Sequence, residues 1–366
     1  MPDFAAKDRE FMQRSLLLAE NGVFGAQPNP MVGCVLVKDG DIVGEGWHAR
    51  AGEAHAEVNA LLDAGDKARG ATAYVTLEPC SHHGNTPPCC DALIEAGIAE
   101  VVLAHEDPNP QVNGQGIARL QQAGVTVRTG LLRENARRLN AGFLTRMQRG
   151  RPRVQLKVAC SLDGRIAMAD GQSQWITGAE ARADVQRLRA RAGAILTGIG
   201  TVLADDPSLT VREAKLNPHN RQPLRVVLDS DLRMSPAAKM LSLPGRTLIF
   251  CGPDANAKDL ARAGAEVLRT TGDNGFLDMA AVLKELAQRG VNDLLVEAGP
   301  TIAGQLLVLR LVDELVIYQA PHILGSETIG MFDTPSWQQL TDRQSLTITE
   351  YSQVGNDTRI TAIPEY

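Results

Sequence analysis

Three residues in the first quarter of the chain have the types and order of a zinc site with one open position. His55 begins a segment with helical spacing, Cys80 follows a strand-like segment, and Cys89 precedes a second helical segment. One histidine and two cysteines suit a four-coordinate Zn²⁺ whose fourth position takes water. Glu57 lies close enough to His55 to reach that water without binding the metal, as a proton shuttle must.

The order of these residues matches the pattern of zinc deaminases, His-x-Glu followed by Pro-Cys-x-x-Cys. Here the loop between the cysteines is expanded to eight residues. Each short motif is common by chance, but the ordered set is specific. We therefore predict a hydrolytic deaminase that binds one zinc ion per chain through His55, Cys80 and Cys89, with Glu57 as catalytic acid and base.

Two other cysteines of the first half are not assigned as zinc ligands. Cys90 adjoins Cys89 and is the alternative ligand, although we expect it to be a buried thiol of the domain. Cys34 stands in an apolar, strand-like segment and is expected in the core. The alternative to a zinc site is that these cysteines are buried structural thiols.

Two stretches of the second half have the composition of a nucleotide site. Residues 197–212 follow a strand-like segment and are rich in Gly, Thr and Asp, and residues 296–304 pass from strand to helix through Gly299. The free backbone N–H groups at a helix start can bind phosphate. Neither stretch has the G-x-G-x-x-G fingerprint, so the residues alone leave a nucleotide site and a plain turn equally open.

Alternating strands and helices must position these residues in the first half. A hairpin is predicted around residues 38–41, helices at 54–68, 90–96 and 117–123, and strands at 73–77, 100–104 and 125–129. Such alternation favours a mostly parallel sheet covered on both faces.

The alternation restarts in the second half. Strands are expected at 154–161, 194–198, 224–228, 247–251 and 294–297, helices at 179–192 and 278–289, and late antiparallel strands at 314–320 and 346–351. The arginine-rich stretch 133–153 reads as a solvated helix and linker, or as a phosphate-facing surface. It marks the boundary between domains at 1–147 and 148–366.

Length and composition limit the class of protein. A chain of 366 residues is too long for one core, and 44% hydrophobic residues with a net charge of −6 argue against disorder. No apolar run is long enough to span a bilayer, and six sparse cysteines do not form a disulfide framework. A sequence pI near 5.7 gives no general attraction to nucleic acid. We expect a cytoplasmic enzyme of small molecules, with neither nucleic acid nor membrane as partner.

Longer motifs resemble one family. The runs at 27–33, 55–57, 76–84, 86–89 and 107–110 closely resemble the bifunctional riboflavin biosynthesis deaminase/reductase family, and the likeness extends across the second half. The resemblance implies an N-terminal cytidine deaminase-like three-layer α/β/α domain, followed by a dihydrofolate reductase-like α/β domain that uses NADPH. It also implies a homodimer or higher homo-oligomer.

The resemblance implies two reactions. The first hydrolyses the 2-amino group of 2,5-diamino-6-ribosylamino-4(3H)-pyrimidinone 5′-phosphate. The second reduces the ribosyl group to a ribityl chain, which gives 5-amino-6-ribitylamino-uracil 5′-phosphate.

The resemblance also assigns the deaminase pocket. The residues that it places against the substrate are Asn29, His48, His82, Asp107 and Asn109. Asn29 and Asn109 have the alternative role of holding Asn-Pro turns. Asn85 stands where relatives often have a basic residue, which leaves His82, His83 and Arg50 as candidates for the substrate phosphate.

In the reductase half, the residues implied to contact NADPH are Ala159, Trp175, Thr201, Asp205, Ser230, Gly299, Pro300, Thr301, Ile302, Ala303, Gly304 and Gln305. Those implied to face the substrate are Lys157, Ser173, Arg189, Leu209, Arg212 and Glu297. The alternatives are a core aromatic for Trp175 and a solvated helix face for Arg189.

Two other functions stay open. One is a tRNA or nucleoside deaminase with an unrelated second domain. The other is a binding module whose second half is a regulatory nucleotide sensor. Residues 1–150 contain more acidic than basic residues, which argues against an RNA substrate.

Overall fold

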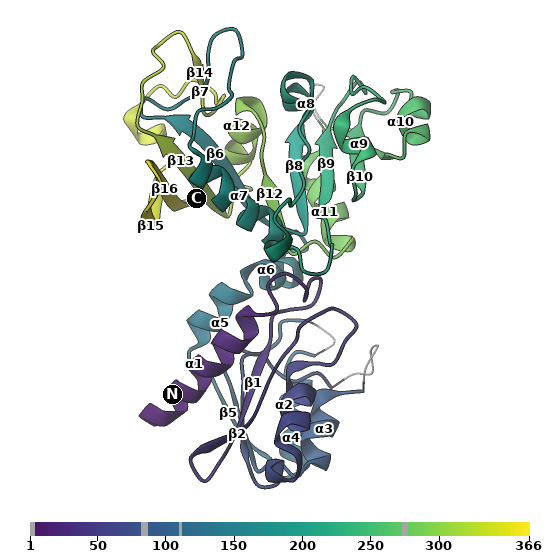
Figure 1. Cartoon of the computed structure of the whole chain (residues 1–366), viewed down its shortest axis with the longest axis vertical. Coiled ribbons are helices and arrows are strands. Elements are labelled where there is room, and N and C mark those ends of the chain that lie inside the picture. The colour runs from purple at the N-terminus through teal and green to yellow at the C-terminus, as the bar shows by residue number, and fades with distance from the viewer. Residues whose placement is uncertain (1–3, 82–86, 110–111, 273–276) are drawn as a thin grey trace. The chain divides into compact units, whose positions relative to one another are not determined.

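The computed structural model describes residues 4–81, 87–109, 112–272 and 277–366. The chain divides into two compact units, Met1–Gly150 and Arg151–Tyr366 (Figure 1). The predicted boundary after residue 147 falls inside a helix, because the last helix of the first unit continues to Arg149. Gly150, whose φ is 65°, ends that helix.

The first unit is built on a five-stranded sheet in the order β2-β1-β3-β4-β5. Its elements are α1 (Ala6–Glu20), β1 (Gly33–Lys38), β2 (Asp41–Trp47), α2 (Ala56–Ala64), β3 (Thr72–Val75), α3 (Cys89–Glu95), β4 (Glu100–Leu103), α4 (Gln115–Gln122), β5 (Thr126–Thr129), α5 (Arg133–Leu139) and α6 (Ala141–Arg149). The predicted hairpin is confirmed as antiparallel β1 and β2, while β3, β4 and β5 run parallel.

Helices cover both faces of this sheet (Figure 1). Alternate strand residues separate into two cores, because successive side chains of a strand point to opposite faces. Leu36 and Val75 pack with α2, α3 and α4, whereas Val35 and Tyr74 pack with α1 and α5. The predicted three-layer α/β/α arrangement is confirmed.

A glycine in β2 brings α2 to its place. A Cβ at Gly46 would lie 2.4 Å from the carbonyl oxygen of Ala56. Only glycine therefore lets the first turn of α2 lie against the strand. This contact fixes the start of the helix that carries His55 and Glu57.

The second unit contains a nine-stranded sheet in the order β11-β10-β9-β8-β12-β6-β13-β16-β15. The strands of the unit are β6 (Arg153–Ser161), β7 (Arg165–Ala167), β8 (Ala194–Gly198), β9 (Leu224–Leu228), β10 (Thr247–Cys251), β11 (Glu266–Arg269), β12 (Asp293–Val296), β13 (Glu314–Ala320), β14 (Ile329–Gly330), β15 (Leu346–Val354) and β16 (Asp357–Pro364). Of these, β7 and β14 pair in a separate two-stranded sheet. The helices of the unit are α7 (Ala179–Arg191), α8 (Ile199–Asp205), α9 (Lys239–Ser242), α10 (Lys258–Arg262), α11 (Met279–Gln288) and α12 (Pro300–Val308).

The strands from β11 to β13 are parallel, and β16 and β15 add an antiparallel hairpin at one edge. Residues of α11 and α12 pack on one face of this sheet, and residues of α7, α9 and α10 pack on the other. The sheet is thus a buried layer with helices on both sides, as expected for an α/β unit.

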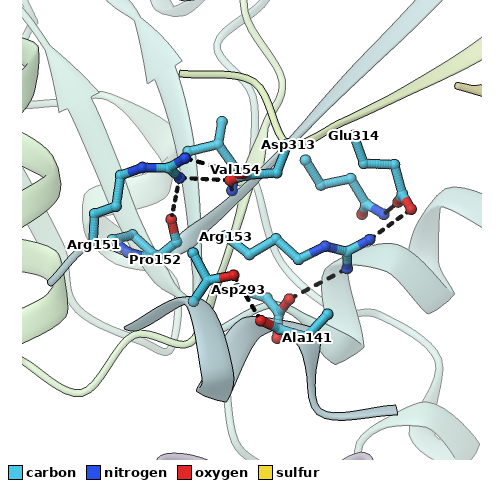
Figure 2. A network of polar contacts seen from close by, with 10 residues as sticks. Ala141, Arg151, Pro152, Arg153, Val154, Asp293, Asp313 and Glu314 are labelled. Carbon is cyan, nitrogen blue, oxygen red and sulfur yellow. Dashed lines mark hydrogen bonds and ion pairs between the residues drawn. The ribbon is translucent and has the colours of Figure 1, made fainter. Parts of the chain in front are cut away.

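The expectation of a solvated linker is wrong for the end of the arginine-rich stretch. Residues 133–149 form α5 and α6, and the side chains of Arg151 and Arg153 are only 15% and 24% exposed. Arg151 contacts the Asp313 carboxylate at 2.5 and 2.8 Å, and Arg153 contacts Glu314 at 2.5 Å (Figure 2). These pairs join the starts of β6 and β13, so the two arginines serve the second sheet.

Candidate active sites

The three predicted zinc ligands meet at the starts of two helices and in the loop that follows a strand. His55 precedes α2, Cys80 follows β3, and Cys89 is the first residue of α3. His55 Nδ1 lies 3.1 Å from Cys89 Sγ and 3.6 Å from Cys80 Sγ. The three donor atoms all lie within 4.8 Å of one another, so one cation can contact all of them.

The charges at this cluster fit a divalent cation. Hydrogen bonds from the thiol of Cys89, from His55 and from the Cys89 N–H hold the pKa of Cys80 well below its usual value. The contact with Cys80, followed by burial, raises the pKa of Cys89 well above its usual value. Two sulfurs this close share one proton unless a cation neutralises both, and Zn²⁺ supplies that charge.

Glu57 lies beside the cluster in the first turn of α2 and is 3% exposed. Burial, with a further contribution from Cys80, raises the pKa of its carboxyl to about 7. Such a carboxyl can accept and release a proton near neutrality, as a general acid and base requires.

The other two cysteines of this unit lie outside the cluster. The Cys90 thiol is fully buried and donates to the carbonyl of Pro79 at 3.3 Å. Cys34 is fully buried in the core beneath α2. Both positions agree with the expectation of buried thiols.

Asn29 and His48 lie together next to the cluster. Asn29 Nδ2 is 3.1 Å from His48 Nε2, while His48 Nδ1 is 3.1 Å from the carbonyl oxygen of Ala54. Because a carbonyl only accepts, Nδ1 carries the proton and Asn29 donates to Nε2. The His48 ring packs edge-on to His55 at 5.1 Å, so the Asn29 side chain is linked through His48 to the metal cluster.

One residue that supports this loop gave no signal in the sequence. Asn140, at the junction of α5 and α6, donates to the carbonyl of Met31 and accepts from its N–H, both at 2.8 Å. This pair of bonds fixes the segment that carries Asn29. A single asparagine more than a hundred positions away could not have been found from spacing.

Asp107 and Asn109 follow β4 on a largely buried loop. The N–H of Asn109 donates to Asp107 Oδ1 at 2.8 Å, and Asp107 is 7% exposed. Burial raises the pKa of the Asp107 carboxyl to about 6. The predicted contact His82 lies outside the described residues, as do His83 and Asn85, and Arg50 is an exposed residue 3.9 Å from Glu53.

The second unit contains a cavity of about 1090 Å³ at the carboxyl ends of β8, β9 and β12. Open α/β sheets bind ligands at this edge. All but two of the predicted reductase residues line the cavity. These lining residues are Lys157, Ala159, Ser173, Trp175, Arg189, Thr201, Asp205, Leu209, Arg212, Ser230, Glu297, Gly299, Pro300, Thr301, Ile302 and Gln305.

The two exceptions are Ala303 and Gly304, which lie in the packed side of α12. A Cβ at Gly304 would lie 1.9 Å from the carbonyl oxygen of Asp333. The structure thus gives this glycine a packing role, because only its missing side chain allows the chain at Asp333 to pass so close.

Arg189, Glu297 and Lys157 form a charged group in the cavity wall. Arg189 donates to Glu297 through Nε at 2.6 Å and through Nη2 at 3.0 Å. Burial alone would raise the pKa of Glu297, but Arg189 and Lys157 hold it below its usual value. Burial lowers the pKa of Lys157 against the attraction of Glu297. A solvated face for Arg189 is excluded.

Trp175 and Asp205 face the same cavity from different segments. Trp175 is 69% exposed, which excludes a core aromatic, and the guanidinium of Arg182 lies 4.6 Å above its ring. The Gln174 side chain donates to Asp205 Oδ1 at 3.2 Å. The wall residues Arg182, Arg233 and Lys239 were missed, since exposed basic residues are common and gave no distinctive spacing.

Fold and sites together define a class: a hydrolytic deaminase unit with a His-Cys-Cys metal site, joined to an α/β unit with a nucleotide-sized cavity. None of the described helices is long and apolar enough to cross a membrane.

Comparisons with known proteins agree with both halves. A family described as the zinc-binding region of cytidine and deoxycytidylate deaminases matches residues 5–105, and the RibD C-terminal domain matches residues 152–360. The Escherichia coli riboflavin biosynthesis protein RibD is 52% identical over 96% of this chain and 98% of its own. The Acinetobacter baumannii RibD structure has a TM-score of 0.90 at 42% identity, covering 98% of this chain and 99% of its own.

A Thermotoga maritima structure with a TM-score of 0.86 and 33% identity covers 98% of this chain and 99% of its own. It is described as a diaminohydroxyphosphoribosylaminopyrimidine deaminase and 5-amino-6-(5-phosphoribosylamino)uracil reductase. The chain belongs to the RibD family of bifunctional deaminase and reductase enzymes of riboflavin biosynthesis. The alternative of a tRNA or nucleoside deaminase is not favoured.

Proposed function

We propose that the first unit deaminates 2,5-diamino-6-ribosylamino-4(3H)-pyrimidinone 5′-phosphate. In the second step, the second unit reduces the product to 5-amino-6-ribitylamino-uracil 5′-phosphate with NADPH. The observation that carries the first step is the cluster of His55, Cys80 and Cys89 beside the buried Glu57. The Thermotoga maritima protein described above is named for the same pair of steps.

In the deaminase unit, His55, Cys80 and Cys89 hold one zinc ion. Bound zinc acidifies a water molecule, so that hydroxide is available near neutral pH. Glu57 would carry two protons in turn, the first from that water to the ring nitrogen and the second from the newly added hydroxyl group to the amino group, which departs as ammonia. Its pKa of about 7 suits both directions of transfer.

The substrate lies against the loops around the cluster. Asn29, whose amide orientation is set by His48, hydrogen-bonds the pyrimidine. Asp107 and Asn109 bind the ribosyl hydroxyls from a buried loop. We include His82 in this pocket on family resemblance alone.

In the reductase unit, the cavity would hold NADPH, which would supply the hydride. The fit is supported by the size of the cavity and by the start of α12, where the N–H groups of Thr301 and Ile302 have no partner within the helix and suit a phosphate. The residues that hold the cofactor are Ala159, Trp175, Thr201, Asp205, Ser230 and the segment from Gly299 to Gln305, in which Ala303 and Gly304 contribute backbone and packing only.

The deaminated substrate lies at the other end of the same cavity. Glu297, paired with Arg189, orients the pyrimidine, and Arg212 pairs with the phosphate. Arg212 forms no ion pair with any described residue, so its guanidinium is available. Ser173, Leu209 and Lys157 complete this wall.

We also propose a homodimer formed through the outer strand of the second sheet. Strand β15 is an edge strand, and Ile348 and Tyr351 on it are 60% and 68% exposed. Exposed apolar edge strands are sites of pairing with another chain. Ile348→Glu should convert a dimer to a monomer, as measured by light scattering after size exclusion.

A cytoplasmic location is consistent with the chemistry, because the metal site needs reduced thiols and the cytosol maintains them. The partners are phosphorylated pyrimidines, with neither nucleic acid nor membrane involved.

A paired assay tests the proposal. The chain with one equivalent of zinc should release ammonia from the diaminopyrimidine phosphate and then oxidise one NADPH per ammonia. No ammonia from this compound, together with release from a nucleoside or tRNA, would contradict the proposed substrate.

A further inference from the structure

Glu78 is a buried carboxylate to which neither predicted site assigns a role. It stands two residues before Cys80, is 4% exposed, and forms no ion pair with any described residue. A buried charge without a cation is expensive unless hydrogen bonds stabilise it.

Four backbone N–H groups provide those hydrogen bonds. Oε1 accepts from Gly116 at 2.9 Å and from Ile117 at 3.2 Å. Oε2 accepts from Asp107 and from Gly114, both at 3.1 Å. All four donors belong to one loop and the helix that follows it.

The two oxygens do different things. Oε1 satisfies the second and third residues of α4, as any N-terminal cap would. Oε2 reaches outside the helix to Asp107, whose own carboxylate orients Asn109. A helix cap needs only Oε1, so the contact with Asp107 requires a further explanation.

The loop is fastened to Glu78 at its beginning and at its end. The N–H of Glu78 also donates to the carbonyl of His105 at 3.0 Å. A Cβ at Gly116 would lie 2.2 Å from the Pro79 carbonyl oxygen and 3.1 Å from Glu78 Oε1. Glycine at 116 therefore allows this close contact between α4 and the turn that leads to Cys80.

We propose that Glu78 is a positioning residue of the deaminase, which holds the Asp107–Asn109 segment at a fixed place relative to the Cys80 turn. It touches neither metal nor substrate. This inference rests on the proposed substrate role of Asp107 and Asn109. Its expected signature is a defect in substrate binding in an enzyme that keeps its zinc and most of its turnover.

Glu78→Gln is the test variant, because it keeps the shape of the side chain. In either orientation its amide group faces two backbone donors and repels them. The KM for ammonia release should rise roughly 10-fold or more while kcat changes less than about 3-fold. Zinc content and reductase turnover should stay as in the parent.

Glu100→Gln is the matched control, since Glu100 is a carboxylate of the same unit that pairs with Arg128 and not with the loop. It should leave KM unchanged. Gly116→Ala disturbs the same contact from the opposite side and should reproduce the rise in KM. Glu78→Asp and Gly116→Ala carry the test if Glu78→Gln does not fold.

Amide hydrogen exchange provides a readout independent of activity. Exchange at residues 105–109 and 112–117 should be faster in Glu78→Gln, and exchange at the start of α2 should be unchanged. Unchanged KM in Glu78→Gln and Gly116→Ala would overturn the proposal, and so would loss of zinc from Glu78→Gln, which would make Glu78 part of the metal site. Faster exchange without any ammonia release by the parent enzyme would instead refute the proposed function and leave the fastening of the loop intact.

Discussion

Arg189 of α7 and Glu297 at the end of β12 form a two-point ion pair inside the reductase cavity. The contacts are 2.6 Å from Nε to Oε1 and 3.0 Å from Nη2 to Oε2, and the side chains are 13% and 12% exposed. The pair fixes the direction of the Glu297 carboxylate, which leaves its remaining lone pairs for a ligand. Arg189 therefore acts on the substrate through Glu297.

Arg189→Lys keeps the charge and loses the two-point geometry. We expect the KM for the deaminated intermediate to rise about 10-fold, while deamination is unchanged. Arg187→Lys, on the exposed face of the same helix, is the control and should behave as the parent. Steady-state kinetics with the pre-formed intermediate measure both, and an unaltered KM in Arg189→Lys would exclude this role.

The metal-ligand assignment makes a prediction that distinguishes adjacent cysteines. Cys89→Ser should lose zinc, whereas Cys90→Ser should retain about one ion per chain, because Cys90 points to the Pro79 carbonyl. Metal analysis after gel filtration gives the answer. The reverse pattern, zinc lost from Cys90→Ser and kept by Cys89→Ser, would show that the wrong thiol was assigned.

Removal of zinc should also destabilise the first unit, because the ligands join the starts of α2 and α3 to the loop that follows β3. Chelation should lower the temperature at which the first unit unfolds and leave the unfolding temperature of the second unit unchanged. A chelator that leaves both transitions unchanged would contradict a structural contribution of the metal.

Lys157 should destabilise the second unit at neutral pH. Burial lowers its pKa from 10.5, so the folded state disfavours the protonated form, and this penalty disappears as the pH rises toward 10.5. Lys157→Met should raise Tm at pH 7, with a smaller gain near pH 10, and should lose reductase activity. Lys284→Met, on the exposed side of α11, should do neither. If Lys157→Met instead lowered Tm equally at both pH values, Lys157 would stabilise the second unit through its contact with Glu297.

A substitution at Arg212 should distinguish the substrate site from the cofactor site. Because a guanidinium binds phosphate through two parallel hydrogen bonds, Arg212→Lys should raise the KM for the phosphorylated intermediate and leave NADPH affinity nearly unchanged. Fluorescence titration with NADPH tests the second half of this statement. A collapse of NADPH affinity with an unaltered substrate KM would move Arg212 to the cofactor site.

Much of the architecture could be predicted from local patterns. The β1–β2 hairpin follows from the turn at Asp39 and Gly40, which both adopt positive φ. The metal cluster could be predicted because its residues lie at element ends that short motifs mark. Helix α1 was not predicted, since only a few of its residues are apolar and buried.

What could not be predicted depends on contacts between distant residues. Arg151 was expected in solvent, but its partner Asp313 lies 162 positions away. Glu78 was seen only as part of the motif before Cys80, because its four N–H partners are backbone groups that any sequence would supply. Ion pairs between distant residues, and hydrogen bonds from backbone N–H groups to a side chain, leave no pattern in the spacing of residues along the sequence.

The central claim is that two independent sites catalyse the two steps, and Glu57→Ala tests it most directly. In a folded variant that keeps its zinc, ammonia release should fall at least ~10²-fold, the usual contribution of a general acid and base. Oxidation of NADPH with the pre-formed deaminated intermediate should stay within about 2-fold of the parent, and exposed Glu53→Ala should change neither activity. An equal loss of both activities in Glu57→Ala, or ammonia release at the parental rate, would contradict two separate sites with Glu57 as the proton carrier of the first.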